Sequence, residues 1–167
     1  MGFLVRHHLI EKMIAKIDNG KIAKIAWQEF IIRHLPDFKG CMIIFLGKED
    51  ISRLTEISEI RVGSLFIAVS NPAQSEKLNK QISENQILNY EALDFIDRVK
   101  ILTDQKGFEN VIVIDSSPGA IKLALGVAGV FATIYLFTMP SASVIADLHN
   151  TIHYKSLKVI GCRPGNV

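Results

Sequence analysis

Cysteine, net charge and a cleavable leader are what this sequence has least of. Its two cysteines, Cys41 and Cys162, cannot form a disulfide scaffold, and 19 Lys and Arg nearly balance 17 Asp and Glu. A formal charge of +2 is too small and too scattered for a nucleic-acid groove. The beginning of the chain lacks the basic, apolar and small-residue regions of a secretory signal. We therefore expect a cytoplasmic protein with reduced thiols that binds no nucleic acid.

The 167 residues, 49% of them hydrophobic and 22% charged, are enough for one globular domain and leave no room for two full ones. The stretch from Leu123 to Ala146 is uncharged and longer than the roughly 20 residues that a membrane-spanning helix needs. Gly126, Gly129 and Pro140 interrupt it, and residues 130–137 are rich in β-branched and aromatic side chains. This composition favours a helix end, a buried strand and a turn over a membrane span.

Short apolar runs alternate with longer amphipathic stretches from Cys41 onward. Strands that are apolar on both faces and separated by helices predict a doubly wound α/β domain, with a mostly parallel sheet of about six strands. The expected strands are 42–46, 65–69, 86–89, 110–114, 130–137 and 157–160, and the expected helices are 51–60, 75–82, 93–102 and 118–128. In the helix over 93–102, the residues expected to face the sheet are Leu93, Ile96, Val99, Ile101 and Leu102.

Residues 1–38 are predicted to form a short helical N-terminal extension, because the only plausible domain boundary lies near Pro36 to Gly40. Its second helix would carry Trp27, Phe30 and Ile31. These three side chains either cover the sheet or form an exposed patch that binds a partner.

In an open parallel sheet the ligand site lies beyond the carboxyl ends of the strands, where the strand order reverses. The candidate loops are therefore 47–50, 70–72, 115–119 and 138–141. The segment Asp115-Ser116-Ser117 before Pro118 lacks the G-x-S-x-G pattern of a nucleophile elbow, and it is expected to cap the helix that follows. No catalytic residue is predicted.

Several motifs occur in a fixed order along the chain: residues 98–103, Lys106-Gly107-Phe108, His153-Tyr154 and the ending from Val159 to Asn166. Together they resemble the dinucleotide-binding domain of the medium-chain, zinc-dependent alcohol and polyol dehydrogenases, nearest to sugar-phosphate members such as L-sorbose-1-phosphate reductase. The resemblance implies that residues 39–167 form a Rossmann-like domain that binds NAD(P). The positions it assigns to the cofactor are Gly47, Ser70, Asp115, Ser116, Phe137 and Thr138.

The phosphate loop departs from the G-x-G-x-x-G pattern that such a domain uses. Gly47 matches the first glycine, but Glu49 and Ser52 stand at the second and third, and Asp50 adds a further carboxylate. Two carboxylates where a pyrophosphate should meet a helix N-terminus oppose binding of that anion. We therefore expect this loop to hold a dinucleotide poorly or not at all.

Two other positions bear on cofactor and metal. Ser70 stands where an acid would bond the ribose hydroxyls; it either accompanies a 2′-phosphate with Lys77 as the basic neighbour, or it caps the next turn. His149 and His153 are four residues apart but have no third ligand nearby, and the N-terminal extension has no cysteine, so no metal site is predicted.

Three functions remain open on this sequence. The chain is a degenerate cofactor domain that acts as an accessory or assembly subunit, one half of a split NAD(P)-dependent sugar-phosphate or polyol oxidoreductase, or a small-molecule sensor that uses the crevice. The resemblance further implies a homodimer through the sheet edge near Met139 to Val144, and a separate catalytic subunit as a second partner.

Overall fold

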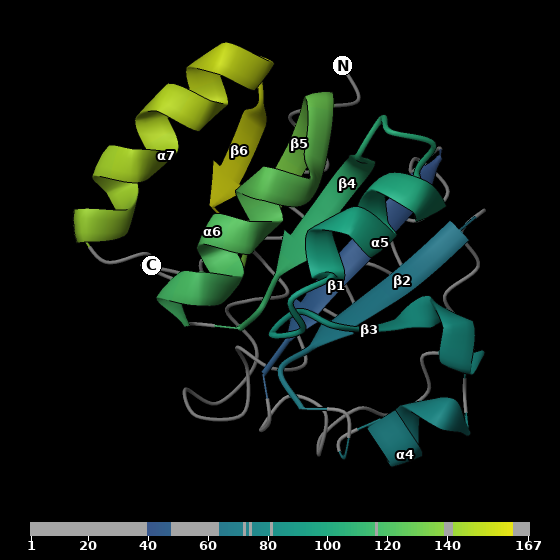
Figure 1. Ribbon diagram of the computed structural model, residues 1–167. Coiled ribbons are helices and arrows are strands. Elements are labelled where there is room, and N and C mark those ends of the chain that lie inside the picture. Colours follow the sequence, from purple (N-terminus) through teal and green to yellow (C-terminus); the bar gives the residue numbers. More distant parts are fainter. Residues whose placement is uncertain are drawn as a thin grey trace, which may run out of the picture.

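The computed structural model of the chain describes residues 40–47, 64–71, 73, 75–80, 82–115, 117–138 and 142–161. Within these residues six strands form one parallel sheet, in the order β3-β2-β1-β4-β5-β6 (Figure 1). The predicted doubly wound α/β fold is therefore confirmed, whereas the N-terminal extension and the helix expected over 51–60 lie outside the described residues. The strands are β1 (Cys41–Leu46), β2 (Ser64–Val69), β3 (Ile87–Asn89), β4 (Phe108–Val113), β5 (Ala128–Leu136) and β6 (Lys158–Gly161).

Helices cover both faces of this sheet. On one face α5 and α6 pack against a large core, and both lie in front of the sheet in Figure 1; on the other, Leu78 of α4 packs against a smaller core. The predicted helix over 118–128 is α6, and the one expected over 75–82 is the shorter α4. The helices are α4 (Ser75–Asn79), α5 (Phe95–Leu102), α6 (Pro118–Val127) and α7 (Ala142–Lys155), with a 3₁₀ turn η4 (Glu84–Gln86) before β3.

The central strand β1 explains why the sheet is buried on both sides. Its alternate residues Ile43 and Phe45 enter the larger core, while Met42, Ile44 and Leu46 enter the smaller one, and all five are buried. Side chains of a strand alternate between its faces, so an uninterrupted apolar run suits only a strand covered twice. The strand order reverses at β1, between β2 and β4.

The inward face of α5 matches the prediction at Val99, which is buried, and at Ile96, which packs against the larger core, but it differs elsewhere. Phe95 and Val99 are its buried residues, whereas Leu93 is fully exposed and Ile101 is 75% exposed. Leu93 lies two residues before Phe95, where α5 begins, so it is not part of any face of the helix. Ile101 follows Val99 by two positions, which at 3.6 residues per turn places it on the opposite side of the helix.

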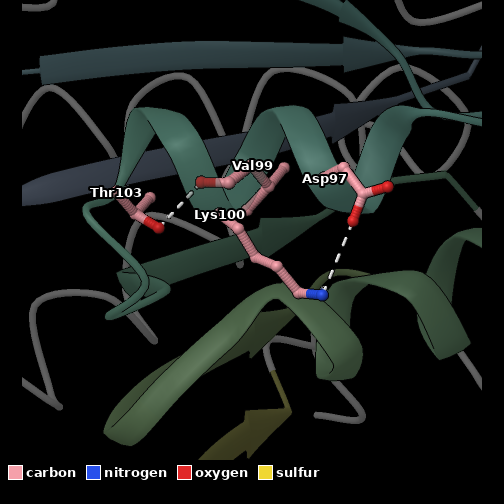
Figure 2. A network of polar contacts seen from close by, with 4 residues as sticks. All are labelled: Asp97, Val99, Lys100 and Thr103. Carbon is pink, nitrogen blue, oxygen red and sulfur yellow. Dashed lines mark hydrogen bonds and ion pairs between the residues drawn. The ribbon is translucent and has the colours of Figure 1, made fainter.

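The end of α5 is fixed by a buried threonine (Figure 2). Thr103 donates its hydroxyl to the carbonyl oxygen of Val99 at 2.8 Å and accepts from the backbone N–H of Gly107 at 3.0 Å. Figure 2 also shows the ion pair of Lys100 with Asp97 at 3.5 Å, which is exposed and so contributes little. The threonine therefore sets the turn that leads into β4.

Two glycines allow that turn to lie against the start of β5. Gly107 has a φ of 77°, and a side chain there would come within 2.7 Å of the backbone nitrogen of Gly129. A side chain at Gly129 would in turn come within 2.5 Å of the carbonyl oxygen of Lys106. The backbones approach more closely than any larger residue permits.

The helix α7 was not predicted as an element, and a lysine near its end joins it to α6. The Lys155 ammonium donates to the carbonyl oxygens of Leu125, Gly126 and Ala128 at 3.0, 2.8 and 2.8 Å. These carbonyls belong to the last turn of α6 and its C-cap, where a cation is favoured.

The edges of the sheet are β3 and β6. Of the segment 139–144 expected to supply a dimer edge, residues 139–141 are outside the described residues, and residues 142–144 form the start of α7. Homodimerisation itself stays a prediction. Among the described helices, none has the length and apolar character needed to span a bilayer.

Candidate functional site

The parallel strands bring the predicted loops to one edge of the sheet. Gly47 follows β1, Ser70 follows β2, and Phe137 and Thr138 follow β5. Asp115 lies two residues beyond β4. Residues 49, 50, 52 and 116 lie outside the described residues, so the expectations for the phosphate loop and for Ser116 stay predictions.

A buried hydrogen-bonded pair occupies the centre of this carboxyl edge. The Tyr90 hydroxyl donates to Oδ2 of Asp115, and Oδ1 of Asp115 accepts from the backbone N–H of Ser117 at 2.8 Å. Tyr90 is 7% exposed and Asp115 9%. Both carboxylate oxygens are thus engaged by groups of the protein itself.

Tyr90 spans the sheet from β3 to the end of β4. Its backbone N–H donates to the carbonyl oxygen of Val69 at the end of β2, at 3.0 Å. Its ring lies 5.7 Å from the ring of Phe45 in β1, centroid to centroid. The Asp115 N–H donates to the Phe45 carbonyl at 3.2 Å, so the pair is anchored to the strand at which the order reverses.

Burial is the main cause that raises the pKa of Tyr90 to about 12, and the hydrogen bond to Asp115 and the charge of that carboxylate contribute to the same rise. Hydrogen bonds of the hydroxyl with the Ser117 and Ser70 side chains act in the opposite direction. The phenol therefore stays protonated at neutral pH and serves as a donor. Three loops, after β2, β3 and β4, meet at this hydroxyl.

The sequence pointed to Ser70 and Asp115 but missed Tyr90. The rule that ligand sites lie at the carboxyl ends of strands applies equally to β3, and Tyr90 follows its last residue, Asn89. A tyrosine at that position, with an apolar ring and a polar tip, was the available signal.

Ser117 acts as a helix cap, as predicted for its segment. Its Oγ accepts from the backbone N–H of Ala120 at 3.2 Å, and Pro118 is the first residue of α6. This hydroxyl therefore satisfies one of the otherwise unpaired N–H groups at the start of α6.

Phe137, another predicted position, lies on the other face of the sheet from the Tyr90 ring. The Phe137 N–H donates to the carbonyl oxygen of Val113 at 2.9 Å, and its side chain packs against the smaller core on the other face of the sheet. Thr138 and Gly47 are half-buried. The structure thus unites Ser70 and Asp115 through Tyr90, but it does not bring Phe137 into that network.

Metal ligands are not gathered in the part of the chain that the structure describes. It holds no group of three or more His, Cys, Asp or Glu side chains that could bind an ion. His149 and His153 are exposed on α7.

No protein-family model matches the chain, and no curated protein matches it in sequence. Its fold does match solved structures. The alcohol dehydrogenase TADH from Thermus sp. ATN1 has a TM-score of 0.60 and 16% identity, over 86% of this chain and 41% of that one. Galactitol-1-phosphate dehydrogenase from Escherichia coli has a TM-score of 0.57 and 17% identity, over 87% and 44%. Mycobacterial Rv1454c complexed with NADPH has a TM-score of 0.58 and 15% identity, over 87% and 49%.

The chain spans less than half the length of each of these structures. At such low identities the likeness establishes the fold alone, which is a Rossmann-like α/β fold with a parallel sheet. The resemblance seen in the sequence motifs is thereby confirmed at the level of the fold.

Proposed function

We propose that this chain is a cofactor-type domain without dehydrogenase activity of its own, which serves as an accessory or assembly subunit. The observation that carries the proposal is the Tyr90–Asp115 pair. The groups that meet at the carboxyl edge are bonded to one another: the Tyr90 hydroxyl to Asp115, and the second carboxylate oxygen to the Ser117 N–H. A ligand that needs these groups would have to break buried hydrogen bonds, each costing about 0.5–1.5 kcal/mol.

The loop after β1 supports the same conclusion from the sequence. Gly47 is followed by Glu49 and Asp50, where a pyrophosphate would need uncharged backbone and the positive end of a helix. Repulsion by these carboxylates and the closed network at the edge both weaken dinucleotide binding.

A thermal-shift experiment with NADH and NADPH tests this proposal. A ligand present at a hundred times its Kd adds about 2.7 kcal/mol to the free energy of unfolding, which is readily detected. We expect no shift for the unmodified chain. The variant Glu49→Gly/Asp50→Asn/Ser52→Gly/Tyr90→Phe, which restores the glycine pattern and removes both loop carboxylates and the Tyr90 hydroxyl, should gain a shift, and the control Glu91→Gln should not. A clear shift of the unmodified chain with either dinucleotide refutes the proposal.

A second candidate function is one half of a split NAD(P)-dependent sugar-phosphate or polyol oxidoreductase. It is favoured by the likeness to galactitol-1-phosphate dehydrogenase, of which this chain covers 44%. On this account a second polypeptide supplies the substrate pocket, and dinucleotide binds only when both are present. Oxidoreductase activity that arises on mixing this chain with such a partner would support the split enzyme over the accessory subunit.

A further inference from the structure

Four apolar side chains are exposed at the amino ends of β4 and β5. Phe131 is 78% exposed and Val130 65%, and Ile101 and Leu102 at the end of α5 are 75% and 39% exposed. We call these four residues the amino-edge patch. The backbones that carry its two halves come close together, because the turn that follows Leu102 leads to Gly107, which lies against Gly129, the residue before Val130.

An irregularity in β5 directs part of this patch outward. Phe108 of β4 pairs with Ala128 of β5, and Asn110 pairs with Thr133. Between these two pairs β4 has one residue and β5 has four, so β5 bulges at residues 129–132. Phe131 has a φ of 61°, in the left-handed region that a bulky residue adopts at a cost of order 1–3 kcal/mol. A strained backbone that exposes an aromatic ring is expected where that ring has a partner to contact.

The chain that precedes β1 enters the sheet beside this patch. Gly40 has a φ of 86°, and a side chain on it would collide with the carboxylate of Glu109 in β4. Glu109 lies between Phe108 and Asn110, the residues whose partners flank the irregularity of β5. Only β4 lies between β1 and β5, and neighbouring strands are about 4.8 Å apart, so the chain arrives two strand spacings, about 10 Å, from the strand of Phe131.

We propose that residues 22–35 cover the amino-edge patch through Trp27, Phe30 and Ile31. This segment lies outside the described residues. Trp27, Phe30 and Ile31 are the apolar side chains that we expect its helix to carry. About nine residues join Ile31 to Gly40, with an extended reach of roughly 30 Å, several times the distance required. A segment tethered this closely has an effective concentration in the millimolar range, which favours it over a second copy or a separate protein.

Trp27 is the single tryptophan of the chain, so its fluorescence reports on this contact alone. In the full chain we expect a blue-shifted emission and shielding from acrylamide. The double variant Phe131→Gly/Ile101→Ser should shift the emission to the red and increase acrylamide quenching, while glycine relieves the strain at position 131. The control Leu93→Ser removes a fully exposed leucine. Leu93 lies between the carboxyl end of β3 and the start of α5, far from the amino ends of the strands, so both signals should stay unchanged.

Three results would overturn the proposal. One is Trp27 quenching in the full chain that equals quenching in the urea-unfolded chain. Another is an unchanged Trp27 signal in the double variant while its far-ultraviolet circular dichroism stays native. The third is shielding that disappears on dilution, which would assign the patch to a second copy.

Hydrogen exchange keeps the proposal testable if the double variant does not fold. The variant Trp27→Ser/Phe30→Ser leaves the sheet unaltered and should speed exchange of the amides of residues 129–133. Equal exchange rates in this variant and the unmodified chain would contradict the proposed contact.

Discussion

Tyr90 and Asp115 form a buried hydrogen bond that links the end of β3 to the end of β4. The phenol passes beside Phe45 of β1, and its backbone is held by Val69 of β2. One residue, through its backbone and its side chain, thus connects four neighbouring strands at their carboxyl ends. The edge at which an open α/β sheet usually receives a ligand is here joined by contacts within the chain.

Tyr90→Phe should lower the free energy of unfolding by about 1–3 kcal/mol, because it leaves a buried carboxylate oxygen without its donor. Urea unfolding followed by circular dichroism measures the loss. Tyr154→Phe is the matched control, since Tyr154 is exposed on α7, and it should stay within about 0.5 kcal/mol of the unmodified chain. Equal effects of the two substitutions would show that the bond contributes nothing.

The raised pKa of Tyr90 predicts a loss of stability in alkaline solution. Unfolded tyrosine releases its proton near pH 10, whereas folded Tyr90 holds it to about pH 12. The stabilisation is complete below pH 10 and is lost as the pH rises to 12, with a slope of up to about 1.4 kcal/mol per pH unit. The stability difference between the unmodified chain and Tyr90→Phe should therefore shrink over this window, and a constant difference would refute the assignment.

Lys155→Met should destabilise the domain by about 1–3 kcal/mol, because it removes the donor to three carbonyl oxygens near the end of α6. Burial lowers the pKa of Lys155 and so opposes its charged form. The three carbonyl oxygens and the negative end of the α6 dipole act in the opposite direction and stabilise the ammonium. Lys122→Met, which removes an exposed lysine of α6, is the control. Urea unfolding of both variants measures the difference. If their midpoints coincide, Lys155 does not stabilise the end of α6.

Gly129→Ala should cost about 1–3 kcal/mol, because its methyl group would lie 2.5 Å from the carbonyl oxygen of Lys106 and neither backbone can move freely. Gly126→Ala is the comparison, since the nearest atom there is a side-chain carbon of Ile96 at 3.9 Å. It should be neutral or stabilising by up to about 1 kcal/mol, as expected for alanine in a helix. Thermal melting of both variants decides, and a stable Gly129→Ala would refute the close approach of the two turns.

The sheet could be predicted from the sequence because β1, β2 and the second half of β4 are apolar on both faces, a pattern that fits a buried parallel strand. The face of α5 could not be read as easily. Apolar residues occur at Leu93, Ile101 and Leu102 as well as at Phe95 and Val99, so more than one face of the helix is apolar in the sequence. Packing on the sheet selects the face of Phe95 and Val99.

Tyr90 was harder to predict from the sequence than Ser70 and Asp115, the other residues of the candidate site. The partners Tyr90 and Asp115 are 25 residues apart, so their contact depends on the strand order rather than on any local motif. Tyr90 also follows β3, which at three residues is the shortest of the described strands and too short to show a clear periodicity. The helix α7 escaped prediction because it begins inside the uncharged run that includes β5.

Calorimetric titration of the purified chain with NADH and with NADPH tests the central claim most directly. A closed carboxyl edge and an acidic phosphate loop predict no saturable heat with either dinucleotide up to millimolar concentration. Saturable binding with a micromolar Kd would show that the Tyr90–Asp115 pair and the carboxylates after Gly47 leave a working cofactor site, and it would contradict the account.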